Sequence, residues 1–578
     1  MKKVLIANRG EIAMRVARAC RDYGLASVAV YADADSDAPF VALADEAYAL
    51  SGNTPAETYL DAGKLIAIAL RAGADAIHPG YGFLSENAGF AKAVQSAGLT
   101  WIGPDPEVIE ALGDKLSARR IAQSVGAPLA AGSDGAITSV GEAIRFARAF
   151  GLPIAIKAAH GGGGRGLKIA RRIEDVGDMF ESATREAMAA FGRGECFVER
   201  FLDRPRHIEA QVLADRHGHV VVVGTRDCSL QRRNQKLIEE APAPFISAGQ
   251  RQQIHEAARD ICAAAGYTGA GTVEFLLGAD GALCFLEVNT RLQVEHPVTE
   301  ETTGIDLVVE QFRIAEGLPL SVTATPEPHG HAMEFRINIE DPGRGFLPSA
   351  GRVTAWQAPS GPGIRLDAGI AAGSIVPAMF DSLAAKLIVW GKTRAQAIAR
   401  ARRALAEFSI EGVPSVLPFH RAVLDHADFT DRFAVHTRWI ETDFKETLAV
   451  AARPKPPSDE TVRGHVEIDG KRVEIALSGG LLNLLGASAA AAPPETRGAP
   501  ASEPGAVPAP VSGVLVQWRV ADGAHVEAGA PLAVMEAMKM ETAVTAPETG
   551  IVTLLVEPGS TQTAGSTIAR ITHRQDGG

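Results

Sequence analysis

An internal repeat near the end of this 578-residue chain constrains its fold more than any other feature. Pro510-Val-Ser-Gly513-Val514 recurs as Pro547-Glu-Thr-Gly550-Ile551, and Val520-Ala-Asp-Gly523 recurs as Val556-Glu-Pro-Gly559. The copies lie 36 to 37 residues apart, which is too short and too few for a solenoid. They predict an all-β domain of two four-stranded halves related by a two-fold axis. A hairpin over residues 535–541 then joins the halves, with Lys539 at its tip.

Lys539 stands between two methionines in Glu536-Ala-Met-Lys-Met540. An unmodified turn lysine is the plain alternative, because most surface lysines are only solvated charges. The stretch resembles the biotinyl domain of biotin-dependent carboxylases, in which the lysine of Ala-Met-Lys-Met carries biotin. The lipoyl domain is built in the same way, but its lysine usually follows Asp and precedes Ala. The resemblance therefore implies covalent biotin on Lys539, attached by a biotin protein ligase.

Composition excludes several kinds of partner. The net charge is −12 and there is no basic block, so neither nucleic acid nor an anionic membrane is expected as a partner. The apolar start of residues 1–7 is too short for a signal peptide. Five scattered cysteines without a Cys-x-x-Cys pair indicate buried thiols in a reducing compartment. We therefore expect a cytoplasmic protein.

The chain is too long for one domain, and its patterns change along it. Strand-like Val4–Ala7, a helical pattern over 11–21 and strand-like Val28–Tyr31 predict a Rossmann-like unit. Asn8-Arg-Gly-Glu11 is not Gly-x-Gly-x-x-Gly, so dinucleotide binding is not supported. The fold class predicted is α/β and α+β in several domains, ending in the all-β unit. The predicted limits are 1–110, 111–330, 331–447, 448–509 and 510–573.

Residues 448–509 differ from both neighbouring regions. Val462–Leu477 resembles a strand pair that turns at Asp469-Gly470. Residues 487–509 are rich in Ala, Pro, Gly and Ser and predict a tether. Some twenty such residues reach about 25 Å, which suits a swinging arm. We hypothesise that 462–485 docks a partner subunit; unchanged co-purification after deletion of 455–486 would contradict this.

A glycine-rich loop follows the strand-like Pro153-Ile-Ala-Ile-Lys157. Its five glycines suit close approach of backbone N–H groups to phosphates under a mobile cover, and a plain flexible loop is the alternative. No Gly-Lys-Ser/Thr closes it, so it is not a Walker loop. Lys157 and Lys115 could neutralise phosphate charge. The loop glycines are Gly161, Gly162, Gly163, Gly164 and Gly166.

Two strand-like segments, 272–277 and 283–288, flank Gly278-Ala-Asp-Gly281. An Asp-Gly turn at 280–281 would place Glu274 opposite Glu287, with Asn289 on the same face. Like charges directly opposite are destabilising, and a bound cation removes that penalty. Oxygen ligands of this kind suit Mg²⁺. An exposed hairpin with an acidic face is the alternative.

The next residues are Asn289-Thr-Arg291-Leu-Gln293-Val294-Glu295-His-Pro297. The arginine fork of Arg291 suits a planar oxyanion such as bicarbonate, and Glu295 could take a proton from it. Cationic donors also occur in Gln231-Arg-Arg-Asn-Gln-Lys236 and around Arg336. Each alone would usually be a surface ion pair, but together they predict a site for several anions.

Residues 1 to about 445 resemble a biotin carboxylase of the ATP-grasp fold almost continuously. The matching stretches are His78–Asn87, the glycine loop, Arg206–Gln211, Cys228–Arg233, Glu239–Pro244 and Glu287–Glu300. With the biotinyl domain, the chain resembles the α subunit of a bacterial acyl-CoA carboxylase, a ligase. The three parts up to residue 447 are then its N-terminal, ATP-grasp and C-terminal biotin carboxylase domains, and the last is a flattened biotinyl barrel.

The resemblance implies a role for each matched position. For ATP these are Lys115, Lys157, the loop glycines, Glu199, Arg200, Leu202, His207, Gln231 and Asn234. For Mg²⁺ or Mn²⁺ they are Glu274, Glu287 and Asn289. For bicarbonate they are Lys236, Arg291, Gln293, Val294 and Glu295, with Glu295 as base. Arg336 would stabilise the biotin enolate.

Two positions depart from the commonest family pattern. Asn234 stands where many members have His near the ribose, and Arg200 stands where many have Lys near the adenine. Both can still donate hydrogen bonds, so adjusted nucleotide contacts are expected.

No segment is large enough for a carboxyltransferase, so the resemblance implies a separate β subunit as partner. That subunit would choose the acyl-CoA. Acetyl- or propionyl-CoA is favoured by family analogy, while methylcrotonyl-CoA, longer acyl-CoA and pyruvate stay open. A different ATP-grasp ligase and a carrier with an inactive catalytic half are the rival classes.

Overall fold

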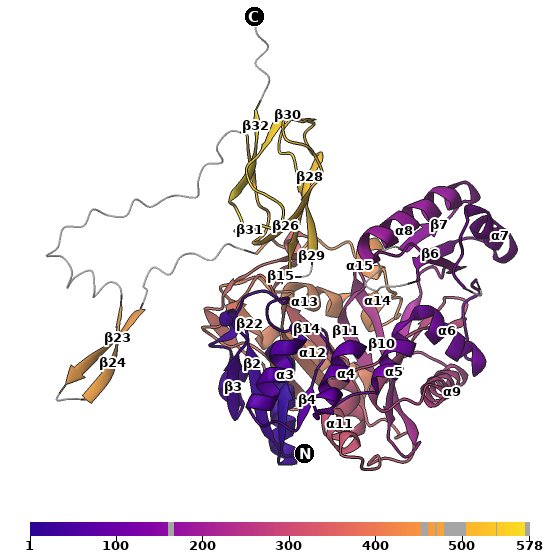
Figure 1. The fold of residues 1–578 in the computed structure, drawn as a ribbon, viewed down its shortest axis with the longest axis horizontal. Helices are drawn as coiled ribbons and strands as arrows, with labels where there is room; N and C mark the ends of the chain where they lie inside the picture. The colour runs from indigo at the N-terminus through magenta and orange to yellow at the C-terminus, as the bar shows by residue number, and fades with distance from the viewer. Residues whose placement is uncertain are drawn as a thin grey trace, which may run out of the picture.

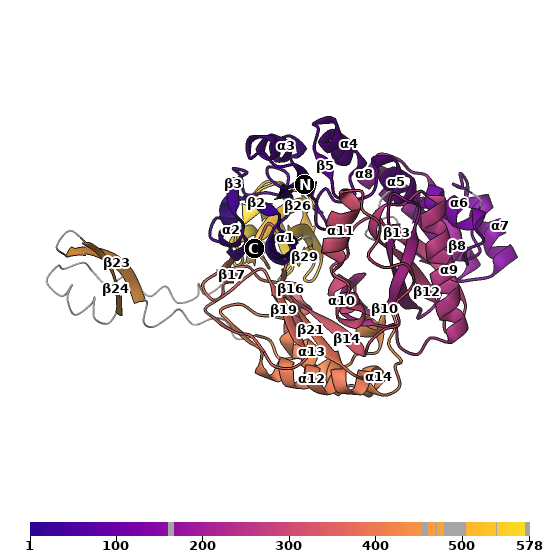
Figure 2. The same cartoon turned by 90° about the horizontal axis from the view of Figure 1, so that it is seen from below.

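The computed structural model describes residues 1–133, 135–159, 167–451, 461–468, 471–478, 505–538 and 540–572. Figures 1 and 2 show a large mixed α/β body with a separate β domain, in yellow, standing on it.

The chain begins with a parallel sheet of order β3-β2-β1-β4-β5. Its elements are β1 (Lys3–Ile6), α1 (Gly10–Tyr23), β2 (Ala26–Tyr31), α2 (Pro39–Leu43), β3 (Glu46–Ala49), α3 (Ala62–Arg71), β4 (Ala76–His78), α4 (Ala88–Ser96) and β5 (Thr100–Trp101). The strands and helix predicted over 4–7, 11–21 and 28–31 are β1, α1 and β2. Ile12, Val16 and Ala19 of α1 are buried, as their helical spacing predicts. The Rossmann-like start is therefore confirmed.

A small three-stranded unit follows, of order β7-β6-β8. After α5 (Pro106–Gly113) and α6 (Lys115–Ser124), it contains α7 (Val140–Phe150), β6 (Ile154–Ala158), β7 (Leu167–Ala170), α8 (Val176–Phe191) and β8 (Cys196–Arg200). It stands at the edge of the body in Figure 1. The predicted strand before the glycine loop is β6, which pairs with β7 through Lys157 and Leu167. The loop itself, 161–166, lies outside the described residues.

One eight-stranded sheet forms the centre of the body, in the order β13-β12-β9-β10-β11-β14-β21-β19. Its strands are β9 (Arg206–Ala214), β10 (Val220–Arg232), β11 (Gln235–Ala241), β12 (Gly269–Leu277), β13 (Leu283–Asn289), β14 (His331–Asn338), β19 (Ile364–Ala368) and β21 (Leu383–Gly391). The sheet crosses the proposed domain limit at 330, because β11 pairs with β14. Residues from two sequence regions thus share one rigid surface.

Helices and short strands complete the body. The helices are α9 (Ala248–Ala264), α10 (His296–Thr303), α11 (Leu307–Ala315), α12 (Arg394–Glu407), α13 (Leu417–Asp425), α14 (Ala427–Thr430) and α15 (Trp439–Thr442). The short strands are β15 (Glu340–Asp341), β16 (Leu347–Pro348), β17 (Gly351–Arg352), β18 (Ala355–Gln357), β20 (Ile375–Val376) and β22 (Ser409–Glu411).

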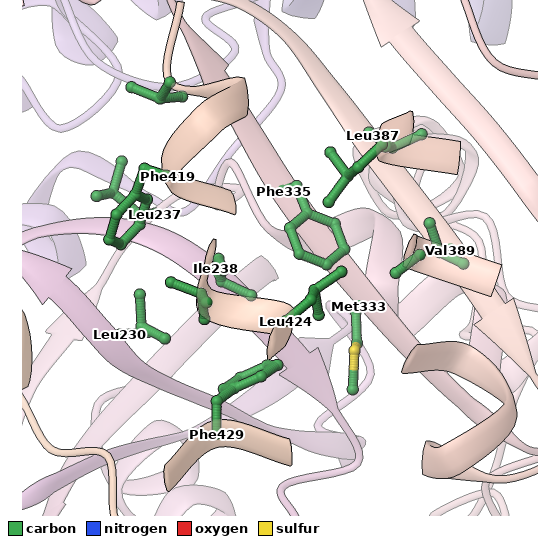
Figure 3. Close-up of a cluster of buried hydrophobic side chains, with 14 of the residues drawn as sticks. Leu230, Leu237, Ile238, Met333, Phe335, Leu387, Val389, Phe419, Leu424 and Phe429 are labelled. Atoms are coloured by element: carbon green, nitrogen blue, oxygen red, sulfur yellow. The ribbon is translucent and has the colours of Figure 1, made fainter. Parts of the chain in front are cut away.

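One large core cluster packs helices α12 to α15 on the sheet (Figure 3). Leu230, Ile238, Phe335 and Leu387 come from four successive strands, and Leu424 comes from α13. All five are at most 2% exposed, so they belong to the close-packed interior between the sheet and its helical layer.

Arg394 ties α12 to the sheet. Its guanidinium donates to both carboxylate oxygens of Glu240, at 2.7 and 3.0 Å, and lies near the rings of Phe245, Phe429 and Phe433. Burial alone would raise the pKa of Glu240, but Arg394 and His331 lower it to about 2. The Glu240 carboxylate therefore contributes stability above about pH 4.5, and this contribution is lost as the pH falls toward 2.

We expect Arg394→Met to lower the free energy of unfolding by about 3–5 kcal/mol, since it leaves a buried carboxylate unpaired. Thermal unfolding should show a lower midpoint, partly recovered in the double variant with Glu240→Gln. Arg403→Met is the matched control, because that arginine is exposed and bonds only Glu407 and a main-chain oxygen among the described contacts. Equal losses for the two arginines would contradict the prediction.

The C-terminal β domain has two four-stranded sheets, β25-β32-β30-β27 and β29-β28-β26-β31. The strands are β25 (Ala506–Pro508), β26 (Gly513–Trp518), β27 (His525–Val526), β28 (Pro531–Ala537), β29 (Met540–Thr545), β30 (Gly550–Leu554), β31 (Thr561–Gln562) and β32 (Thr567–Thr572). Strands β25 to β28 form the first copy of the repeat, and β29 to β32 form the second in the same order. Exchanging each strand with its counterpart turns one sheet order into the other. The two-fold repeat is confirmed, and each sheet contains strands from both copies.

The hairpin that bears Lys539 is β28–β29, with Ala537 paired to Met540. Lys539 itself lies outside the described residues. The other predicted hairpin is also present as β23 (Thr461–Ile468) and β24 (Lys471–Ser478), in which Ile468 pairs with Lys471. Within the described residues, β23 and β24 pair only with each other. The described part of the chain holds no helix long and apolar enough to cross a membrane.

Candidate active site

A cavity of about 860 Å³ opens between the N-terminal sheet, the β6–β8 unit and the eight-stranded sheet. Most predicted site residues line it. They are Lys115, Lys157, Glu199, Arg200, Leu202, His207, Gln231, Asn234, Lys236, Glu274, Glu287, Asn289, Arg291, Gln293, Val294 and Arg336. Residues separated by more than 200 positions thus meet in one place. Glu295 lies behind the wall, fully buried, and the loop glycines and Lys539 lie outside the described residues.

Lys236 is the electrostatic centre of the site. From β11, its Nζ donates to Glu209 at 2.6 Å, Glu274 at 2.9 Å and Glu295 at 2.6 Å. Burial alone would lower the pKa of Lys236, but these three carboxylates raise it well above its usual value. The lysine is therefore a permanent cation at the cavity wall, as an anion site requires.

The predicted carboxylate pair is present. Glu274 of β12 pairs with Glu287 of β13, and Thr272 pairs with Asn289. The predicted turn at 280–281 is wrong, because Leu277 pairs with Leu283 and the N–H of Gly278 donates to the Ala282 carbonyl. A bulge between Glu274 and Phe275 shifts the register by one residue.

A three-residue loop without a bulge would have moved Glu274 out of register with Glu287 by one residue. The bulge shifts the register back, so the two residues pair. The loop of 279–281 contains Gly281 at φ +81°, the left-handed conformation that a three-residue hairpin loop favours. Two departures from a regular hairpin cancel, so Glu274 and Glu287 still face each other.

The pKa values of the two carboxyl groups are shifted in opposite directions. Burial alone would raise the pKa of Glu274, but Lys236 and His207 lower it well below its usual value. Burial and the neighbouring Glu274 raise the pKa of Glu287. The pair therefore has the oxygen donors and the like-charge repulsion that a divalent cation would neutralise. Asn289 Oδ1 adds a third oxygen on this face and accepts from Arg291 at 3.0 Å.

One of the two predicted arginines contacts the acid that was predicted as the base. Arg336 of β14 donates to Glu295 at 2.9 Å and to Glu239 at 2.6 Å. Burial alone would raise the pKa of Glu295, but Lys236 and Arg336 lower it. Arg291 donates to Glu86 at 3.0 Å and not to Glu295. Glu295 precedes α10, where the helix dipole also favours a negative charge.

The other end of the cavity holds the predicted nucleotide contacts. Lys157 of β6 forms an ion pair with Glu199 of β8. Burial lowers the pKa of Lys115, partly opposed by Glu287. His207 Nδ1 lies 2.7 Å from Gln231 Nε2, and its Nε2 lies 2.9 Å from Glu274. Leu202 is 9% exposed and supplies an apolar surface beside these polar groups.

The two unusual positions have a local explanation. Asn234 and Arg233 form the two-residue turn between β10 and β11, since Arg232 pairs with Gln235. Both have positive φ, +63° and +49°, as a type I′ turn requires, and asparagine tolerates this conformation. Arg200 is half-exposed, with its guanidinium 3.8 Å from Asp280. Both side chains still line the cavity.

Sequence reasoning missed three acids that orient the cations. Glu86, Glu209 and Glu239 hold Arg291, Lys236 and Arg336 respectively. Each acid lies in a stretch that was matched to the family, but no role was assigned to the acid itself. For the mostly buried Lys236 and Arg336, the available signal was that such a cation needs a buried partner, whereas the Glu86 side chain is 42% exposed. Met538, beside Lys539, also lines the cavity and was not predicted there.

Four known families match successive parts of the chain. They are "Biotin carboxylase, N-terminal domain" at 1–109, "Carbamoyl-phosphate synthase L chain, ATP binding domain" at 114–323, "Biotin carboxylase C-terminal domain" at 334–442 and "Biotin-requiring enzyme" at 505–571. The fold and site therefore define a biotin carboxylase of the ATP-grasp class, with its biotin carrier on the same chain.

Individual relatives of the chain are also biotin-dependent carboxylases or their subunits. The chain is 56% identical to the biotin-dependent acyl-coenzyme A carboxylase alpha3 subunit of Mycobacterium leprae, over 98% of each chain. It is 47% identical to a biotin carboxylase of Nostoc, covering 74% of this chain and 96% of that one. This protein belongs to the family of biotin-dependent acyl-CoA carboxylase α subunits.

Solved structures have the same carboxylase body. A Campylobacter jejuni biotin carboxylase complex with an ATP analogue has a TM-score of 0.74 at 41% identity, covering 76% of this chain and 98% of that one. The biotin carboxylase domain of Hydrogenobacter thermophilus 2-oxoglutarate carboxylase, solved with MgADP and bicarbonate, has a TM-score of 0.73 at 44% identity, covering 77% and 99%.

Proposed function

We propose that this biotin carboxylase carboxylates the biotin on Lys539 as the first half-reaction of an acetyl- or propionyl-CoA carboxylase, located in the cytoplasm. One observation carries the proposal: Met538, next to the predicted biotinyl lysine, lines the same cavity as Lys236 and the Glu274–Glu287 pair. Carrier and catalytic groups thus share one site.

The proposed chemistry assigns each group a step. Bicarbonate binds Lys236 and Arg291 with Gln293 and Val294, and Glu295 takes its proton. The bicarbonate oxygen attacks the γ-phosphate of ATP, which releases ADP and leaves carboxyphosphate. Carboxyphosphate divides into CO₂ and phosphate, and the phosphate takes the N1′ proton of biotin. Arg336 would stabilise negative charge on the biotin oxygen, and bound biotin would take up the CO₂ at N1′.

The nucleotide lies between the two ends of the cavity in this proposal. Lys115, Lys157, His207 and the glycine loop hold its phosphates, while Glu199, Arg200 and Leu202 surround the adenine. Gln231 and Asn234 contact the ribose side. Glu274, Glu287 and Asn289 hold Mg²⁺ or Mn²⁺, which supplies charge neutralisation for the phosphates.

Glu287→Gln should separate metal binding from folding. We expect the KM for Mg²⁺ to rise by about 100-fold or more, since loss of outer-shell partners alone costs about 10–100-fold. Without metal, the variant should unfold at the same or a higher temperature, because a buried like-charge contact is removed. Stabilisation by added Mg²⁺ and ADP should be lost. Glu256→Gln on the exposed face of α9 is the control; equal Mg²⁺ dependence would contradict the assignment.

The substrate and partner are proposed by family analogy. A separate carboxyltransferase β subunit completes the reaction and selects the acyl-CoA, and β23–β24 is proposed to dock it. An α subunit for methylcrotonyl- or longer acyl-CoA is the second candidate, and biotin protein ligase is the proposed modifying partner. Purifying the native complex and testing several acyl-CoAs distinguishes these substrates.

One assay tests the catalytic proposal itself. We expect bicarbonate-dependent ADP release that free biotin stimulates. A different ATP-grasp ligase or an inactive catalytic half would show no such stimulation.

A further inference from the structure

The biotinyl domain contacts the carboxylase body through its hairpin tip. Figure 1 shows the β28–β29 end directed at the body, beside β15. The side chain of Met538 is only 4% exposed, although it belongs to a turn at the end of a hairpin. Such a residue would be expected in solvent, so its burial needs a partner surface.

That surface is an apolar socket in the carboxylase body. Met538 joins a cluster of buried residues from the short strands and loops that follow β14. They are Ile339, Val353, Val376, Ala384 and Val413. None of these belongs to the biotinyl domain, so the cluster is an interdomain contact.

Two further contacts fix the orientation. The Met538 N–H donates to the Ala378 carbonyl at 3.2 Å, in the segment after β20. Leu347 of β16 packs against the core of the biotinyl domain. Met538 itself has φ +49°, an unusual value for a non-glycine residue.

We infer that Met538 is the docking anchor of the carrier: its side chain fills the 339/353/376/384/413 socket and thereby holds the end of the β28–β29 hairpin at the carboxylation cavity. Asp381, Ser382 and Leu383 adjoin the socket and line the cavity beside Met538, so the anchor lies at the cavity mouth. A flexible methionine suits a contact that must form and break in each cycle. This inference rests on the proposed function, in which Lys539 carries biotin.

The test compares two rates in the full chain with ATP and bicarbonate: carboxylation of the carrier-bound biotin and carboxylation of free biotin, which needs no docking. We expect Met538→Gln to lower the carrier-to-free ratio by about 10–100-fold, from the lost burial of one methionine. Met538→Leu, which keeps an apolar side chain of similar size, should retain most of the wild-type carrier-to-free ratio. Leu555→Gln, on an exposed residue of the same domain, should leave it unchanged.

Because residue 538 adjoins the modified lysine, each rate is divided by the biotinylated fraction measured by intact mass. Val413→Thr changes the socket without touching the hairpin, and should lower the same ratio severalfold, since an isosteric hydroxyl disfavours the apolar side chain. Hydrogen exchange over 375–384 should become faster in Met538→Gln.

The outcomes are distinct. An unchanged ratio in both Met538→Gln and Val413→Thr, with unchanged exchange, would overturn the anchor. Equal falls in both rates would also overturn it, by showing damage to the cavity instead. Absence of biotin-stimulated ADP release in the wild type would refute the proposed function rather than the docking contact.

Discussion

Glu295→Gln is expected to reduce bicarbonate-dependent ATP turnover by about 10²–10⁴-fold, the usual effect of losing a positioned base. The substitution keeps the size of a fully buried side chain and removes only its charge. Lys236 and Arg336 remain, so the cavity keeps its cations. Steady-state ADP release with and without bicarbonate measures the effect.

The pKa of Glu295 makes this prediction sharper. Lys236 and Arg336 outweigh burial and lower the pKa of this carboxyl, so it stays ionised across the assay range but is a weak base in the free protein. A bound bicarbonate offsets the positive field of Lys236, so base strength should rise only in the complex. We therefore expect no acid limb from Glu295 in the pH profile of kcat/KM, which reports the free enzyme.

A matched control distinguishes catalysis from stability. Glu301→Gln lies on α10, six residues further along, and changes a partly exposed ion pair with Arg365. It should retain full turnover, and both variants should bind ADP as the wild type does. Glu295→Gln activity above about one-tenth of wild type would show that another group takes the proton.

Lys539→Arg is expected to abolish acyl-CoA carboxylation by the assembled enzyme. Arginine keeps the positive charge, but its guanidinium stays protonated and cannot form the amide with biotin. Intact mass should show biotin on the wild type and none on the variant. ATP turnover stimulated by free biotin should persist, because the cavity is unchanged.

Lys392→Arg, an exposed lysine of the carboxylase body, is the control for this substitution. It should remain biotinylated and active. A biotin adduct that survives in Lys539→Arg would place the modification on another lysine.

Several parts of the fold follow from local patterns. The strand–helix–strand start and the two-fold β repeat were predicted because apolar spacing and turn glycines act over a few residues. The Glu274–Glu287 pair was also predicted, but through a turn that does not exist. The bulge between Glu274 and Phe275 has no sequence signal in a single chain, since it depends on which neighbouring strand the residues meet.

The residue types of the site could be predicted from the sequence, but the hydrogen bonds and ion pairs between them could not. Arg291 and Glu295 were expected to serve one bicarbonate site, but nothing in the spacing predicted that Arg291 donates to Glu86, more than 200 residues earlier. Arg336 was expected near biotin, and the structure adds Glu239 and Glu295 as its partners. Such partners come from different strands of one sheet, and pairing across a sheet is not encoded in the spacing along the chain.

The sequence by itself determined the elements, the repeat and the chemistry of the motifs, because these depend on short-range periodicity and residue type. Only the tertiary structure decided that β11 and β14 belong to one sheet, and that Met538 enters a socket built from 339–413. The physical reason is that burial and ion pairing act through space. A methionine beside the predicted biotinyl lysine is buried only because five apolar side chains from another domain surround it.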